Sequence, residues 1–112
     1  MRPILSEQDF AVALSAEQAV IYFFVEWSVY AVRGRQRFAE LESSHGRDSE
    51  TSFWIADVSS VDAPAAFVAD WLKAQDRSAF VMACAGGGPI VWLERGVIVD
   101  VVQRAWSARE VT

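Results

Sequence analysis

Residues 19–41 read AVIYFFVEWSVYAVRGRQRFAEL. The first part, 19–25, is uncharged and rich in aromatic and β-branched side chains, which is typical of a strand buried on both faces. From residue 31 onward, the small and apolar residues recur at helical spacing, with arginines between them: Ala31, Gly34, Phe38 and Leu41. A strand that runs into a helix places the free N–H groups of the helix at the carboxyl end of the sheet, where open α/β sheets keep their sites. The pattern therefore predicts a site within residues 26–30.

The rest of the chain is expected to alternate between helices and strands. The sequence Ser-Glu-Gln-Asp at residues 6–9 has the form of a helix start and predicts a helix over 6–15, with Phe10, Val12 and Leu14 facing inward. The helix after the first central strand is expected to begin at Ser28 or Val29 and to end near Ser43. A polar loop then covers 44–50, and a second buried strand covers 52–58.

In the second half, Pro64 marks a third helix that ends near Gln75. Residues 79–84 are compatible with either a short strand or a packed loop. Strands over 90–93 and 97–102, joined through Glu-Arg-Gly, predict a hairpin. Ser107 is a possible cap for a last helix close to the end of the sequence.

Two segments carry a resemblance to thioredoxins. Residues 22–31, YFFVEWSVYA, resemble the segment in which a hydrophobic strand leads through Glu-Trp into Cys-Gly-Pro-Cys and a helix. Residues 88–98, GPIVWLERGVI, resemble the second landmark of that family, a cis-proline that opens a strand and a hairpin. The resemblance covers most of the chain. It implies a single α/β domain over 1–112: a thioredoxin-like fold with a central mixed sheet of about four strands flanked by helices. The C-terminal helix is expected to be short or missing, which leaves Trp106 to be covered otherwise.

The resemblance stops at the redox chemistry. Ser28 stands where the family has its attacking cysteine, and Ala31 where it has the resolving cysteine. Tyr22 stands where many thioredoxins bury an acid, and Gln36 where they place a proline. Dithiol exchange needs one thiolate to attack and a second thiol to release the mixed disulfide. We therefore expect a degenerate site without oxidoreductase activity.

In the family, the motif and the cis-proline loop form a groove that holds an extended polypeptide. The resemblance accordingly implies a binding site for a protein or an extended peptide, with self-association as a further possibility. The alternative is a relic surface whose aromatic residues are merely partly exposed. The candidate binding residues are Trp27, Ser28, Val29, Tyr30, Ala31, Gly88 and Pro89.

Three other residues or groups each have two interpretations. Ser28 is either a nucleophile or, as the absence of a neighbouring base favours, a cap that accepts a backbone N–H. Cys84 is either a reactive thiol near the groove or, more commonly for a free cysteine, a small buried hydrophobe. Arg33 and Arg37 form either a patch for an acidic partner or a solvated face in which one of them pairs with Glu40. Burial of Glu26 behind the motif is a further possibility.

Composition excludes several classes of function. A formal net charge of −5 argues against a general nucleic-acid binder. One cysteine and one histidine provide neither an intramolecular disulfide nor a typical metal site, and we expect no metal and no cofactor. The three glycines at 86–88 lack the Gly-Lys-Ser/Thr ending of a phosphate loop. No apolar run approaches the ~20 residues of a membrane helix. Glu7 and Asp9 interrupt what would be a signal peptide, so a cytoplasmic location is the default expectation.

These observations favour a non-catalytic module that binds protein or peptide through a surface of Trp27, Tyr30 and Pro89. One alternative is a thiol-redox accessory protein that uses Cys84 in monothiol exchange. A purely structural domain is the other alternative.

Overall fold

A computed structural model of the chain describes residues 1–45 and 50–102. In this part of the chain, one mixed sheet of five strands is flanked by four helices. The elements follow one another as β1 Arg2–Pro3, α1 Glu7–Ser15, β2 Gln18–Phe24, α2 Ala31–His45, β3 Thr51–Asp57, α3 Ala66–Gln75, α4 Arg77–Cys84, β4 Ile90–Glu94 and β5 Val97–Val102.

The sheet has the strand order β1-β3-β2-β4-β5. The strands β1, β3 and β2 are parallel, β4 is antiparallel to β2, and β5 is antiparallel to β4. β2 therefore lies at the centre, paired on both sides along most of its length, as its uncharged sequence predicts. Its carboxyl end and that of β3 lie side by side, since Phe24 is in register with Asp57.

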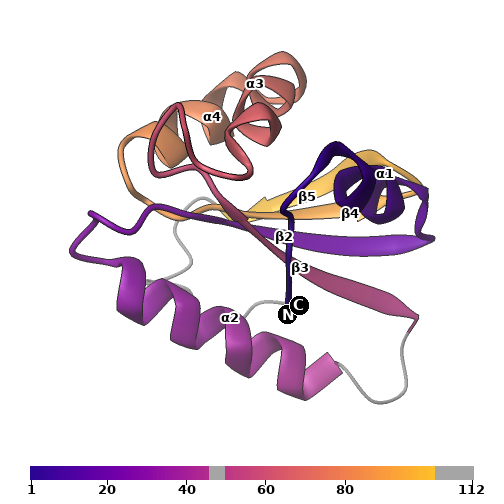
Figure 1. Cartoon of the computed structure of the whole chain (residues 1–112). Helices are drawn as coiled ribbons and strands as arrows, with labels where there is room; N and C mark the ends of the chain where they lie inside the picture. Colours follow the sequence, from indigo (N-terminus) through magenta and orange to yellow (C-terminus); the bar gives the residue numbers. More distant parts are fainter. Residues whose placement is uncertain (46–49, 103–112) are drawn as a thin grey trace.

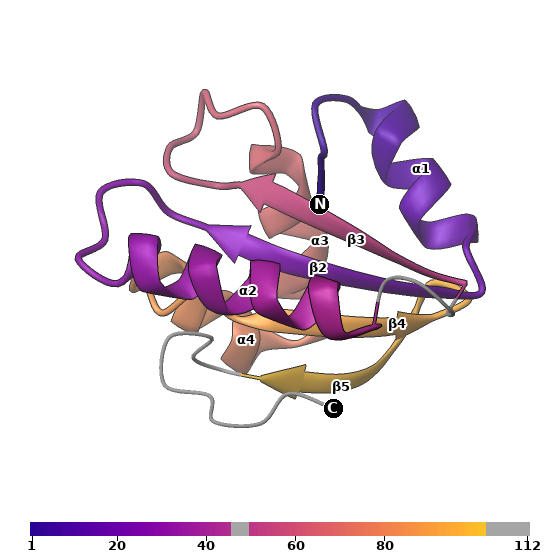
Figure 2. The ribbon, with the colours of Figure 1, turned by 90° about the horizontal axis from the view of Figure 1, so that it is seen from below.

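The side chains of β2 alternate between two hydrophobic cores, because successive residues of a strand point to opposite faces. Ala19, Ile21 and Phe23 pack with α1, α3 and α4, whereas Val20 and Tyr22 pack with α2. Figure 1 shows the result as three layers: α2 covers one face of the sheet alone, and the other three helices lie on the opposite face. The view in Figure 2 places α2 across β2 and β4.

The structure confirms the α/β class, the mixed sheet and the closing hairpin. It also confirms the start of α1, because the Ser6 hydroxyl oxygen accepts a hydrogen bond from the Asp9 backbone N–H at 3.2 Å. The hairpin turns at Arg95 and Gly96, both of which have positive φ, as a two-residue turn between twisted strands requires.

Four predictions about the elements need correction. Residues 79–84 belong to a helix, α4, and not to a strand or loop. The two-residue strand β1 was not predicted, and its shortness gives no sequence signal. Helix α2 begins at Ala31 and not at residue 28 or 29. Val12 is exposed, and Ala13 takes the inward position beside Phe10, because these two residues share the buried face of α1.

The expected short or missing C-terminal helix, with Trp106 and Ser107, lies outside the described residues, as does most of the loop predicted after α2. In the described ranges, none of the helices has the length and apolar character that crossing a membrane requires.

Candidate functional site

The segment between β2 and α2 is a hydrogen-bonded turn held at the carboxyl end of the sheet. The Ser28 N–H donates to the Val25 carbonyl at 3.1 Å, and the Ala31 N–H donates to the Ser28 carbonyl at 3.1 Å. The Tyr30 N–H is bound by the Ser28 side chain, with its hydroxyl oxygen accepting at 3.1 Å. This local bonding competes with helix formation, which explains why α2 starts later than the sequence pattern predicts.

Ser28 is a structural hydroxyl in this arrangement. While its oxygen caps the Tyr30 N–H, its own proton is donated to the Gly86 carbonyl at 2.8 Å. Ser28 is therefore a cap, as the second interpretation expects, but it caps the turn that precedes α2 and not α2 itself. The nucleophile interpretation gains no support from His45, which lies at the other end of α2 and contacts the rings of Phe53 and Trp92. A helix of this length separates the two side chains by roughly 20 Å.

Trp27 is held by the loop after β3, whereas Ser28 is held by the loop after α4. Its indole Nε1–H donates to the Ser59 carbonyl at 3.0 Å, and the Glu26 N–H donates to the Ser59 hydroxyl oxygen at 2.8 Å. Ser59 is in turn held by Asp57, whose carboxylate accepts from both the N–H and the hydroxyl of Ser59. The loop after β3 thus holds the loop after β2, although sequence reasoning did not identify Ser59. Glu26 is exposed, so the possibility that it lies buried behind the motif is not realised.

Gly86 lies directly against this turn. It has φ +80, and a Cβ placed there would come within 2.9 Å of the Ser28 Cβ and 3.2 Å of Trp27 Cζ3. A glycine is therefore needed both for the backbone conformation and for the close approach. This contact brings the loop after α4 next to the motif, as the resemblance implies.

Gly88 and Pro89 lie beside the site but do not form its surface. Both are buried, and the Pro89 carbonyl accepts a sheet hydrogen bond from the Phe23 N–H at 3.0 Å. The bond before Pro89 is trans, unlike that of the family landmark which this segment resembles, because the described residues contain no cis peptide bond. The left-handed conformation of Gly88, at φ +66, redirects the chain into β4 instead. Ala31 is likewise buried, which leaves Trp27, Val29 and Tyr30 as the exposed members of the predicted set, with Ser28 partly buried between them.

Tyr22 lies in the core beneath the site, where it contacts both the start of α2 and the loop before β4. Its ring is buried, its hydroxyl donates to the Ala31 carbonyl at 3.4 Å, and it packs against both Gly34 and Gly88. Burial raises the pKa of the Tyr22 phenol to about 12, against a smaller lowering effect of the Arg35 charge. The phenol is thus neutral at ordinary pH and acts as a packing group where the resemblance places an acid.

Cys84 is exposed at the end of α4, two residues before Gly86. The expectation of a buried thiol is therefore wrong, because α4 buries Ala79 and Ala83 and turns Cys84 outward. The Ala85 N–H and the Gly86 N–H close this helix by donating to Val81 and Ala83 carbonyls.

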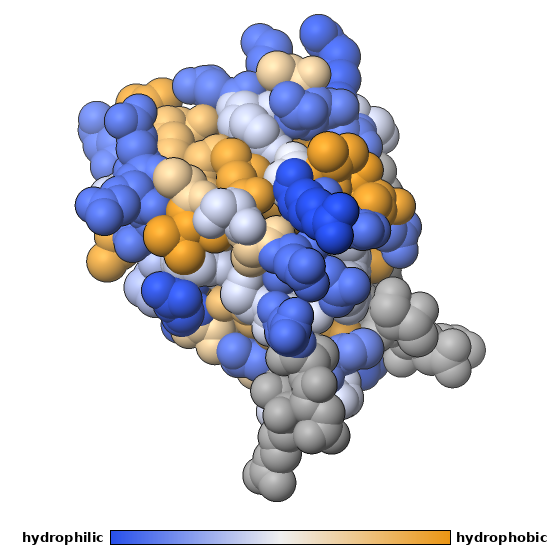
Figure 3. Space-filling model, turned by 90° about the vertical axis from the view of Figure 1, so that its right-hand side faces the viewer, coloured by the Kyte–Doolittle hydropathy of each residue, from blue (hydrophilic) through white to orange (hydrophobic). Residues whose placement is uncertain are grey.

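The exposed side of the site is apolar. Trp27 is 60% exposed, Val29 88%, Tyr30 43% and Val32, on the first turn of α2, 81%. We call these four residues the loop surface. Figure 3 shows the opposite end of the molecule, where patches of hydrophobic side chains lie among hydrophilic ones.

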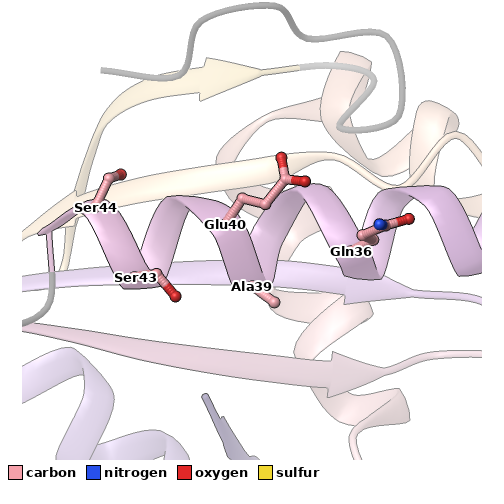
Figure 4. A pocket seen from close by; sticks show the side chains of 5 residues that line it. All are labelled: Gln36, Ala39, Glu40, Ser43 and Ser44. Carbon is pink, nitrogen blue, oxygen red and sulfur yellow. The ribbon is translucent and has the colours of Figure 1, made fainter.

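Shallow hollows lie along the exposed side of α2. One of about 510 Å³ is lined by Gln36, Ala39, Glu40, Ser43 and Ser44. Figure 4 shows that all five side chains come from α2, with Glu40 and Ser44 on one side of the helix and Ala39 and Ser43 on the other. A hollow bordered by a single helix offers little enclosure, so it is a weak candidate for a small-molecule site.

Comparison with solved structures agrees with this geometry. No family profile matches the sequence. No curated protein matches it either. The solution structure of oxidised thioredoxin from Plasmodium falciparum superposes with a TM-score of 0.68 at 17% identity, covering 94% of this chain and 86% of that one.

Thioredoxins from Malassezia sympodialis and Fasciola hepatica are similarly close. The first has a TM-score of 0.66 at 16% identity, with 91% of this chain and 76% of that chain covered. The second has a TM-score of 0.62 at 17% identity, with 94% and 88% covered. The chain therefore has the thioredoxin fold.

Proposed function

We propose that this chain is a non-catalytic thioredoxin-fold module that binds a protein or an extended peptide at the loop surface. The observation that carries the proposal is an exposed apolar loop that is held in one conformation by hydrogen bonds from two other loops. Ser28 is bound to Gly86, and Trp27 to Ser59. A preorganised aromatic surface loses little conformational freedom on binding, and Trp and Tyr are the residues that most often dominate binding energy.

The residues at the motif positions support binding over dithiol exchange. Ser28 and Ala31 stand at the two positions where the resemblance places cysteines, and Cys84 is the one cysteine of the chain. A turnover by the dithiol route therefore lacks the second thiol that releases a mixed disulfide.

Panning of the immobilised chain against a displayed library of random short peptides tests this function. Recovered peptides are expected to bind Trp27→Ala/Tyr30→Ala at least about tenfold more weakly than wild type, the typical cost of truncating central aromatic residues. The matched control is Leu5→Ala/Val97→Ala, which removes exposed apolar side chains elsewhere. Peptides that bind wild type and the aromatic double variant equally well would exclude the loop surface.

A second candidate function rests on the exposure of Cys84. Its thiolate would attack a disulfide of a partner, form a mixed disulfide and release one partner thiol, and an external thiol would then resolve the complex. Mass spectrometry after incubation with oxidised glutathione tests this function, with Cys84→Ser as control. An adduct on wild type that small thiols remove, and that forms faster than on an unfolded chain, would favour exchange.

A further inference from the structure

The first two turns of α2 carry positive charge beside the exposed apolar side chains. Two hollows meet there, and both are lined by Val32 and Gln36. The one of about 530 Å³ also contains Val29, Arg33, Arg37 and Glu40, and the one of about 450 Å³ also contains Phe24, Arg35 and Glu26. The loop surface therefore continues along α2 into a strip formed by Val32 and Gln36. Arg33 and Arg37 border this strip in one hollow, and Arg35 borders it in the other.

Two of these guanidinium groups are available to an outside partner. Arg37 pairs with Glu40 at 3.4 Å. Within residues 1–45 and 50–102, neither Arg33 nor Arg35 has a carboxylate within ion-pair distance. The Arg35 guanidinium lies 5.6 Å from the centre of the Phe24 ring, which keeps it at the edge of the apolar hollow.

The charge distribution of the whole chain makes this strip distinctive. The formal net charge is −5, yet three of the ten Lys and Arg residues lie within residues 33–37. The first turn of α2 has no acidic residue to offset the positive end of the helix dipole. Three arginines against Glu26 and Glu40 leave a small excess of positive charge next to exposed valines in an otherwise acidic protein. This excess suits a partner of negative charge and apolar character.

We propose that the partner of the loop surface is an acidic, apolar polypeptide segment. Its apolar side chains pack on Val29 and Val32, and its carboxylates pair with Arg33 and Arg35. This inference rests on the proposed function and adds the chemistry of its ligand. A formal net charge of −5 favours a peptide over a nucleic acid, because binding to phosphates needs a larger surplus of positive charge.

The experiment compares peptides and charge variants. The displayed library is panned on wild type, and the recovered sequences are synthesised with their acidic residues intact or replaced by amides. Binding is measured to wild type, to Arg33→Gln/Arg35→Gln and to a matched control, Arg77→Gln/Arg95→Gln. The control removes the same charge from α4 and from the hairpin turn.

The recovered peptides are expected to be enriched in Asp and Glu. Arg33→Gln/Arg35→Gln should weaken their binding about fivefold to tenfold, the control should not, and added salt should reduce the difference. Amide peptides should bind both proteins equally. Concentration-dependent sedimentation should show a monomer in the absence of peptide.

Three results would overturn the inference. Peptides that depend on Trp27 and Tyr30 but lack acidic residues would refute it and leave the proposed function intact. Peptides that depend on neither the aromatic residues nor the arginines would refute both. A dimer that the α2 arginine variant dissociates, or equal binding of a single-stranded oligothymidylate, would assign the strip to a different partner.

Discussion

At the scale of single residues, the site depends on contacts that only small side chains allow. Gly86 has a left-handed conformation and lies against Ser28 and Trp27. Gly86→Ala should therefore destabilise the fold by about 2–4 kcal/mol, from backbone strain and from overlap with Ser28. Urea unfolding measures this cost.

The matched control for that substitution is Gly96→Ala, which has the same φ of +80 but lies in the hairpin turn. Both variants should lose stability, whereas only Gly86→Ala should also weaken peptide binding. A Gly86→Ala protein as stable as wild type would contradict the described packing.

Tyr22 gives a second residue-scale prediction, on pH. Its folded-state pKa is about 12, above the ordinary 10.0, so the unfolded chain releases the phenolic proton first as the pH rises. Its contribution to stability is therefore complete below pH 10 and is lost between pH 10 and about 12. Wild type should lose roughly 1 kcal/mol per pH unit more than Tyr22→Phe in this window. Urea unfolding at several alkaline pH values checks the slope, with Tyr30→Phe as the control at the exposed tyrosine. Equal slopes for wild type and Tyr22→Phe would refute the assignment.

At the scale of elements, α4 shows where sequence patterns fail. Residues 77–84 read RSAFVMAC, a short run whose apolar content fits a strand as well as a helix. The decisive signal is the residue before it, because the Asp76 carboxylate accepts a hydrogen bond from the Ala79 N–H at 3.0 Å. Such a cap favours the helix, and it can be found from sequence once the boundary between α3 and α4 is known.

Asp76→Ala should accordingly cost about 1 kcal/mol in the free energy of unfolding. The control is Asp70→Ala, which removes an exposed carboxylate from the middle of α3. Native-state hydrogen exchange should locate the effect in α4, with faster exchange of its amides. Equal stability of the two variants would mean that the cap does not contribute.

Apart from β1, the other elements were predictable for a physical reason. β2 and β3 are buried runs with strong strand composition, and α1, α2 and α3 each show an apolar stripe, so local pattern and burial agree. For the site, the sequence predicts the location but not the contacts that shape it. Burial of Gly88 and Pro89, the trans bond between them, and the role of Ser59 all depend on contacts between loops that are distant in sequence.

At the scale of the whole molecule, the turn between β2 and α2 lies where the resemblance to thioredoxins places a pair of cysteines. The Ala31 N–H donates to the Ser28 carbonyl, so the two residues are the ends of one turn, three positions apart. Such a turn brings its end Cα atoms within about 7 Å, close to the separation that a disulfide requires. The geometry of this turn is therefore compatible with a disulfide between residues 28 and 31.

Ser28→Cys/Ala31→Cys, made in a Cys84→Ser background, is expected to form an intramolecular disulfide on oxidation. The reduced form should reduce insulin disulfides, because an attacking and a resolving thiol are then both present at the end of the sheet. Wild type and the Cys84→Ser protein should show no turnover in the same assay. A single variant, Ser28→Cys in the same background, separates the steps, since it should form mixed disulfides without turning over. Failure of the double variant to close its disulfide while remaining folded would show that the turn at residues 28–31 differs from the geometry described above.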